Sequence, residues 1–217
     1  MAGNVVTLFD TKLKDITKDW IIRHSVSVEA GYVNDPADKG GETNHGITYA
    51  TAQEWKPQLV AKFGWNGKMI DLTEEMALFI YDEGWWKKMR CDDLHRIHPL
   101  LCQRMFDFGI NGGRTTSVRY LQRLLNVLNR GGKDYADQNP DGGIGKITIG
   151  QLEAFVAKRG QRGLLYLLNG LTGMHTYHYI EISEKRVQNE TFTNGWLDRL
   201  FSATEFYARV LIQGEGK

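Results

Sequence analysis

Four carboxylate residues lie close together near the start of the chain, and they are the first candidates for chemistry. They are Glu29, Asp35, Asp38 and Glu42. Glu29 has apolar rather than basic neighbours, and partial burial against apolar groups raises the pKa of a carboxyl group. The other three stand in a stretch rich in glycine, asparagine and proline, where charged side chains stay in contact with water.

Cleavage of a glycosidic bond is the reaction that such a set of carboxylates could perform. A carboxylic acid with a raised pKa donates a proton to the leaving oxygen near neutral pH. A second carboxylate in wetter surroundings activates water or stabilises the cationic transition state. Glu29 suits the first role, whereas Asp35, which precedes Pro36, is better explained as a turn former. By residue types alone, the pattern suggests a glycosidase without specifying one.

The elements around Glu29 are expected to place it at the border between a helix and a loop. Apolar residues at helical spacing predict a helix over residues 13–28, with Asp10 as its N-cap. Residues 31–48 combine glycine, asparagine, aspartate and proline, which predicts a loop or a short irregular hairpin. An acid at the helix end would then face a wet acidic loop.

The rest of the chain is predicted to be mostly helical, which gives a mainly α fold with a small irregular or β region after the first helix. Thr148 is the expected N-cap of one helix that follows a second glycine-rich loop. We expect residues 1–92 and 93–217 to form two regions packed into one globule. The other predicted helices cover residues 51–63, 73–89, 99–110, 118–128, 172–189 and 196–212.

Composition excludes several classes of function. The 217 residues suffice for a buried core, and a formal net charge of +1 disfavours nucleic acid as a partner. No run of apolar residues is long enough for a membrane span, and no secretory signal is visible. Cys91 and Cys102 form no CxxC pair and are expected to be buried thiols. The histidine spacing supports no metal site, and no cofactor is expected.

The sequence around Glu29 resembles the signature of glycoside hydrolase family 108. That family reads E-G-G-Y, then D-P, then G-G-x-T-N-x-G-I-T. The matching segments here are Glu29-Ala30-Gly31-Tyr32, Asn34-Asp35-Pro36 and Gly40-Gly41-Glu42-Thr43-Asn44-His45-Gly46-Ile47-Thr48. The resemblance implies a lysozyme-like fold, N-acetylmuramidase activity on peptidoglycan, and Glu29 as the catalytic residue. Ala30 departs from the family's glycine, and alanine disfavours a positive φ.

A looser resemblance connects the same stretch to phage-type lysozymes, which place an aspartate and a threonine after the acid. The corresponding residues here are Glu29, Asp38 and Thr43, with the threonine one position early. Asp38 is therefore the preferred second carboxylate and Glu42 its rival, while Thr43 is expected to position the attacking water. Tyr32, Asn44, His45 and Thr48 complete the expected site as residues that bind substrate.

The second glycine-rich loop resembles a turn in predicted peptidoglycan-binding domains that follow family 108 catalytic domains. The pattern is Asp141-Gly142, Gly145 and Thr148, and Phe106–Gly113 and Tyr120–Gln122 are also similar to that module. The start of this loop also imitates a calcium-binding loop. Its twelfth position is Thr148, which cannot supply a bidentate carboxylate, so calcium is not expected.

These resemblances imply an endolysin-type hydrolase that cuts the β-1,4 bond between N-acetylmuramic acid and N-acetylglucosamine. Two alternatives stay open: a lytic transglycosylase acting on the same bond, and a peptidoglycan-binding module without catalysis. A monomer is expected. A phage-encoded protein of this type would be made in the host cytoplasm and released to the wall through a holin-like pore. A bacterial origin is equally compatible with the sequence.

Overall fold

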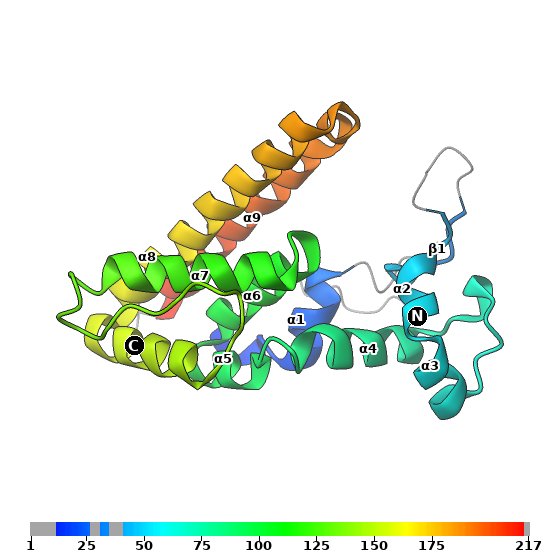
Figure 1. The fold of residues 1–217 in the computed structure, drawn as a ribbon, viewed down its shortest axis with the longest axis horizontal. Coiled ribbons are helices and arrows are strands. Elements are labelled where there is room, and N and C mark those ends of the chain that lie inside the picture. Colours follow the sequence, from blue (N-terminus) through cyan, green and yellow to red (C-terminus); the bar gives the residue numbers. More distant parts are fainter. Residues whose placement is uncertain (1–11, 27–30, 35–40, 215–217) are drawn as a thin grey trace.

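The computed structural model describes residues 12–26, 31–34 and 41–214. Within these residues the protein is mainly helical, with one two-stranded antiparallel sheet that follows the first α-helix (Figure 1). The predicted fold class, mainly α with a small β region, is confirmed.

The first helix is shorter than predicted. A 3-10 turn, η1 (Leu13–Asp15), precedes α1 (Lys18–Ser25), so one helix over residues 13–28 is wrong. Thr17 separates the two elements because its backbone is extended and its hydroxyl accepts a hydrogen bond from the Trp20 amide at 3.2 Å. Threonine side chains commonly compete with the backbone in this way and begin a helix. Asp10, the expected cap, lies outside the described residues.

A tight hairpin follows and confirms part of the predicted irregular hairpin. Strand β1 (Thr43–Asn44) pairs with β2 (Ile47–Thr48), in the register Asn44↔Ile47. His45 and Gly46 form the turn with φ values of 49° and 76°. Positive φ at both turn positions is typical of the type I′ turn, whose twist matches that of the strands. A single bridge between Val33 and Thr43 extends the pairing.

Short helices surround this hairpin. Thr73 caps α4 as predicted, because its side chain accepts a hydrogen bond from the Met76 amide at 3.3 Å. The predicted helix over 51–63 is two helices, which meet at Trp55. The elements are α2 (Tyr49–Glu54), α3 (Lys56–Phe63), η2 (Met69–Asp71), α4 (Glu74–Tyr81), the π-helical turn η3 (Asp82–Trp86) and α5 (Cys91–Ile97).

Helix α6 (Pro99–Asn111) runs through the centre of the molecule. It begins at Pro99 as predicted, and every residue from Leu100 to Gly109 is buried. It contacts α1, α5, α7 (Arg114–Leu128) and the helix that begins at Lys146. One hydrophobic core therefore extends from Ile16 to Leu211. Cys91 and Cys102 are free and buried in this core, as expected.

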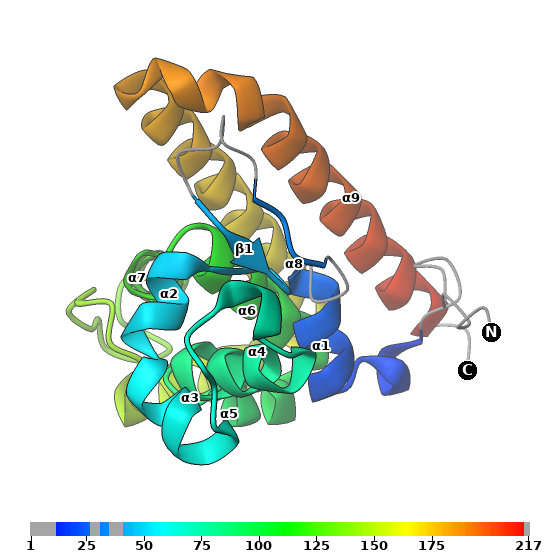
Figure 2. The same cartoon turned by 90° about the vertical axis from the view of Figure 1, so that its right-hand side faces the viewer.

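The C-terminal part of the chain begins with α8 (Lys146–Lys185), whose backbone breaks at Gly160 (φ 55°, ψ −147°). The part of α8 after this break, the 3-10 turn η4 (Val187–Asn189) and α9 (Glu190–Gly214) form a hairpin that projects from the bundle (Figures 1 and 2). The predicted helices 172–189 and 196–212 therefore begin too late. Thr148 is not an N-cap: it lies inside α8, is 1% exposed and donates a hydrogen bond to Gln138 Oε1 at 2.7 Å. No helix among the described residues is long and apolar enough to cross a membrane.

Candidate active site

The segment after α1, the β-hairpin and the turn before α4 together enclose an open depression of about 580 Å³. We call it the site depression. It begins at Gly31, two residues after Glu29 in the sequence. Its lining consists of Gly31, Tyr32, Asn44, His45, Ile70, Asp71, Leu72, Thr73 and Glu74.

Asn44 fixes the hairpin to the opposite wall of the site depression. The side chain is 4% exposed, and its Nδ2 donates to the carbonyl oxygens of Met69 at 2.8 Å and Leu72 at 3.0 Å. Both amide protons are therefore used inside the protein, where buried polar groups need hydrogen-bond partners. Asn44, expected to bind substrate, thus has a structural role in positioning the hairpin.

Tyr32 and Glu42 form a hydrogen-bonded pair at the edge of the site depression. The Tyr32 hydroxyl donates a hydrogen bond to Glu42 Oε1 at 2.9 Å, across the Val33–Thr43 bridge. The Glu42 carboxylate raises the pKa of Tyr32, because a hydrogen bond to an anion stabilises the neutral phenol. Tyr32 is exposed, so its ring is available to stack on a sugar.

Two further carboxylates line the site depression, although no sequence motif singles them out. Asp71 accepts a hydrogen bond from Asn66 Nδ2 at 2.7 Å, and Glu74 forms an ion pair with Arg23 of α1. Glu74 lies in the first turn of α4. No local signal indicates that this helix start lies opposite the hairpin, because that proximity depends on the packing of α4 against the rest of the domain.

The remaining predicted site residues fall into three groups. Glu29 and Asp38, the expected acid and preferred second carboxylate, lie outside the described residues. Thr43 and Thr48 face each other across the hairpin, where Thr48 caps α2 by accepting a hydrogen bond from the Thr51 amide at 3.3 Å. His45 occupies the turn and lines the site depression, and its carbonyl accepts a hydrogen bond from Tyr81 at 3.4 Å.

The structure thus brings Tyr32, Asn44 and His45 together around one depression, with Glu42 hydrogen-bonded to Tyr32, and leaves Thr48 in a capping role. Exposed aromatic and apolar surface beside carboxylates and amides suits a sugar, whose ring faces are apolar and whose hydroxyls form hydrogen bonds. Among the residues that the structure describes, no group of three His, Cys, Asp or Glu is arranged to hold a metal ion.

The second loop, residues 129–145, is built around buried amide side chains. Gln122 of α7 is 1% exposed, its Nε2 donates to Asp141 Oδ1 at 2.9 Å and Gly143 O at 3.0 Å, and its Oε1 accepts from the Gly142 amide at 2.8 Å. Asn129 similarly donates to Asp137 Oδ1 at 2.6 Å. These contacts shape the loop itself and border a surface hollow lined by residues from Asp137 to Thr148.

Comparisons with known proteins agree with this geometry. The family model described as glycosyl hydrolase 108 matches residues 22–113, which include the whole site depression, and the model described as a predicted peptidoglycan domain matches residues 116–201. The structure of SagA from Brucella abortus is similar, with 26% sequence identity, a TM-score of 0.61, and alignment over 87% of this chain and 92% of that one. No curated protein matches the sequence. The chain therefore carries a glycosyl hydrolase 108 domain followed by a predicted peptidoglycan domain, and it is a glycoside hydrolase.

Proposed function

We propose that this protein hydrolyses the β-1,4 bond between N-acetylmuramic acid and N-acetylglucosamine in peptidoglycan, with Glu29 as the general acid. One observation carries the proposal. The E-A-G-Y and G-G-E-T-N-H-G-I-T segments fall inside the glycosyl hydrolase 108 match, and their described residues Tyr32, Asn44 and His45 line one depression.

In the proposed reaction Glu29 protonates the glycosidic oxygen as the bond to the muramic acid C1 breaks. Positive charge then develops at C1 and the ring oxygen, and a nearby carboxylate stabilises it or deprotonates water for attack at C1. The water adds its hydroxyl to C1, so the product ends in a reducing N-acetylmuramic acid. The released N-acetylglucosamine carries the proton from Glu29.

Asp38 and Glu42 remain the two candidates for the second carboxylate. Glu42 is the one whose surroundings are described, and the hydrogen bond from Tyr32, which lines the site depression, would orient its carboxylate there. Asp38 is favoured by its position in the sequence relative to Glu29. Substitution of each separates them.

The test is digestion of purified peptidoglycan by the wild type and by Glu29→Gln, Asp38→Asn and Glu42→Gln, followed by mass analysis of the soluble products. Glu74→Gln is the matched control, because Glu74 also lines the site depression but is already paired with Arg23. Circular dichroism establishes that each variant is folded. Because a general acid contributes on the order of 10²- to 10⁴-fold, Glu29→Gln should lose at least about 100-fold in rate.

The products decide between the proposal and its alternatives. Reducing muropeptides from the wild type and none from folded Glu29→Gln support a muramidase with this acid. Anhydro-muramic ends would instead identify a lytic transglycosylase. Wild-type activity in Glu29→Gln would eliminate Glu29 as the acid.

Delivery to the wall is a separate part of the proposal. In an endolysin role, the enzyme would accumulate in the cytoplasm and reach peptidoglycan through a pore made by another protein. Expression in a bacterial host with and without a pore-forming agent tests this role. Lysis only when the pore is present supports it, and lysis without the pore contradicts it.

A further inference from the structure

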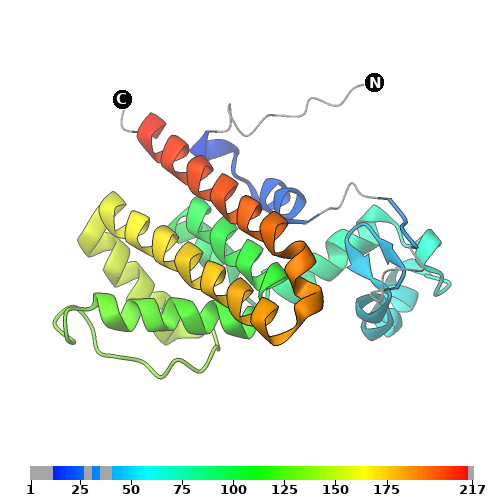
Figure 3. The ribbon, with the colours of Figure 1, turned by 90° about the horizontal axis from the view of Figure 1, so that it is seen from above.

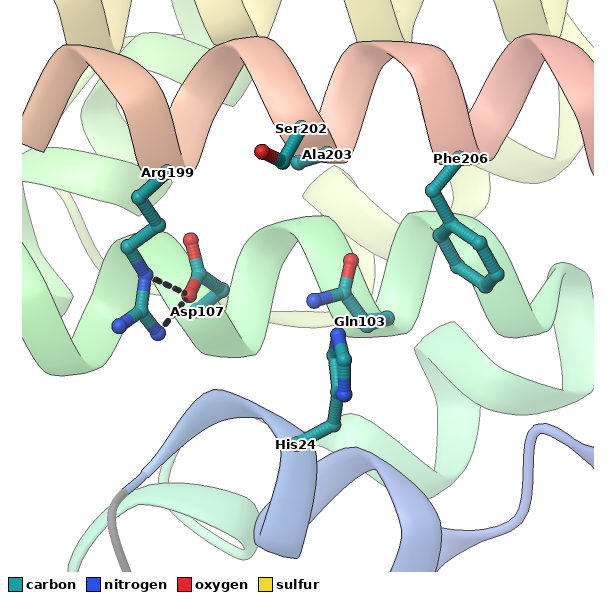
Figure 4. Close-up of a pocket in the computed structure, with 7 residues that line it drawn as sticks. All are labelled: His24, Gln103, Asp107, Arg199, Ser202, Ala203 and Phe206. Carbon is teal, nitrogen blue, oxygen red and sulfur yellow. Dashed lines mark hydrogen bonds and ion pairs between the residues drawn. The ribbon is translucent and has the colours of Figure 1, made fainter. Parts of the chain in front are cut away.

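Arg199 of α9 contacts the C-terminal end of α1. Its Nη2 donates a hydrogen bond to the Ser25 carbonyl oxygen at 2.6 Å. Its Nε donates to Asp107 Oδ1 of α6 at 2.9 Å (Figure 4). Arg199 belongs to the region matched as a predicted peptidoglycan domain, whereas Ser25 and Asp107 belong to the glycosyl hydrolase match. One guanidinium group therefore connects the two family regions.

A second arginine, Arg104, also holds Asp107 in place. Arg104 is fully buried, and its Nη2 donates to Asp107 Oδ2 at 2.7 Å and lies 2.7 Å from His175 Nδ1. Burial and the nearby Arg104 lower the pKa of His175 to about 2, so the imidazole is neutral and Nδ1 can accept this hydrogen bond. The carboxylate thus has an arginine on each oxygen and little freedom to move.

Arg199 donates its hydrogen bond to a carbonyl group at the C-terminus of α1, where helix carbonyl groups lack intrahelical donors. That carbonyl group belongs to Ser25, the last residue of α1. A cation at this end also interacts favourably with the helix dipole. The last described intrahelical bond runs from the Val26 amide to Ile22 O at 3.2 Å. Arg199 therefore fixes the point at which the chain leaves α1, four residues before Glu29.

We propose that Arg199 is a positioning residue for catalysis, oriented by Asp107, through which the peptidoglycan-domain region holds the helix end that leads to the acid. This inference rests on the proposed role of Glu29. A cavity of about 150 Å³ lies beside the contact and is lined in part by His24, Asp107 and Arg199. Close packing therefore does not by itself hold the guanidinium group in place. Its position depends on the hydrogen bonds to Asp107 and Ser25.

The experiment compares Arg199→Gln, Arg199→Lys and Arg96→Gln with the wild type. Arg96 is the matched control: it also joins the two family regions, through an ion pair with Glu153 at 2.5 Å, but it does not contact α1 or the site depression. The measurements are kcat and KM on soluble peptidoglycan fragments, the pH–rate profile, retention on insoluble peptidoglycan, and hydrogen exchange of the Val26 amide. All are made well below each variant's Tm.

For Arg199→Gln we expect kcat to fall on the order of 10- to 100-fold, because small displacements of a reacting group have effects of this size. KM and retention on peptidoglycan should change little, and the basic limb of the pH–rate profile should move as the surroundings of the acid change. Exchange at Val26 should accelerate. Arg199→Lys should recover part of kcat, since an ammonium group supplies charge but not the two-pronged geometry. Arg96→Gln should match the wild type.

An unchanged kcat and pH–rate profile in folded Arg199→Gln would overturn the positioning role. So would a loss of kcat of the same size in Arg96→Gln, because it would indicate a general effect of loosening the two regions. Wild-type activity in Glu29→Gln has a different meaning: it removes the acid assignment. Val26 exchange and the kcat of Arg199→Gln still test whether Arg199 positions the end of α1.

Discussion

The first loop, residues 31–48, and the second loop, residues 129–145, are both rich in glycine, asparagine and aspartate. Their described parts lie at opposite ends of the long axis of the molecule (Figures 1 and 3). In the second loop, buried amides and ion pairs use the polar side chains to hold the loop itself, as Gln122 and Asn129 show. In the first loop, Asn44 has this function, while Tyr32 and Glu42 remain at the accessible surface beside a depression.

Composition therefore identifies a loop, but it does not show whether the polar atoms of that loop are available for chemistry. A polar group that is buried and fully hydrogen-bonded contributes to stability and specificity of the fold. A polar group at an open surface can instead exchange its partners for a substrate. Substitutions in the two loops should therefore separate stability from activity.

The largest expected effect on stability comes from Gln122→Ala, on α7 beside the second loop. Gln122 itself is buried, and its removal deletes the hydrogen bonds to Asp141 and Gly143 and from the Gly142 amide, which should lower the free energy of unfolding by roughly 2 to 4 kcal/mol. Urea unfolding measures this change, with exposed Gln58→Ala on α3 as control. The kcat of the folded enzyme should be unaffected. A large loss of kcat would show that the second loop takes part in catalysis.

Asn44→Ala in the first loop should affect both properties. The variant loses two buried hydrogen bonds, to the carbonyl groups of Met69 and Leu72, so the free energy of unfolding should fall by roughly 1 to 3 kcal/mol. Because the same bonds hold the hairpin against the opposite wall, kcat should fall as well. Thermal unfolding and peptidoglycan digestion of the same sample measure the two effects. Lower stability with unchanged kcat would contradict the link between hairpin position and activity.

Acid should weaken the second loop through Asp134. Hydrogen bonds from Arg130 and Lys158 hold the pKa of Asp134 well below its ordinary value of 3.8. A carboxylate with a depressed pKa in the folded state contributes stability above its unfolded pKa, and this contribution is lost as the pH falls through the folded value. The wild type should therefore lose stability below about pH 4, where unfolded aspartate begins to bind protons.

Asp134→Asn should be less stable at neutral pH and should lose less stability between pH 4 and pH 2. Urea unfolding over a pH series gives this comparison. Glu42→Gln in the first loop provides the contrasting variant, because Glu42 has one described partner, the exposed Tyr32. If Asp134→Asn follows the wild-type pH curve, the ion pairs of Asp134 do not contribute to acid sensitivity.

The smallest expected effect on stability belongs to Tyr32→Phe. This change removes hydrogen bonds of an exposed hydroxyl with Glu42 and Asn34, so the free energy of unfolding should change by less than about 1 kcal/mol. Activity should fall more than stability if Glu42 is the second carboxylate, because the hydroxyl helps to orient it. Initial rates on peptidoglycan, compared with those of Glu42→Gln, measure this. A full rate in Tyr32→Phe together with an inactive Glu42→Gln would leave Glu42 in place and remove Tyr32 from its support.

Several local sequence patterns predicted the structure correctly. Thr73 as a cap, Pro99 as a helix start and the hairpin near residue 45 all follow from hydrogen bonds or φ preferences within a few residues. Other local predictions were wrong: the helix over residues 13–28 is divided at Thr17, which caps α1, and Thr148 lies inside α8 and donates a hydrogen bond to Gln138. A threonine can cap a helix or lie within one, and the partner of its hydroxyl in the folded chain decides between the two.

By itself, the sequence determined the mainly helical class, the two loops and the segments that identify the glycosyl hydrolase 108 family. Only the tertiary structure decided which polar atoms are used up and which remain accessible. The Asn44 side chain is hydrogen-bonded to the turn at residues 69–72, and Glu74 lines the site depression. Arg199 donates a hydrogen bond to the Ser25 carbonyl, 174 residues away in the chain. Such pairs depend on how η2 packs against the hairpin and on how α9 lies beside α1 and α6, and no spacing within the chain encodes contacts of that range.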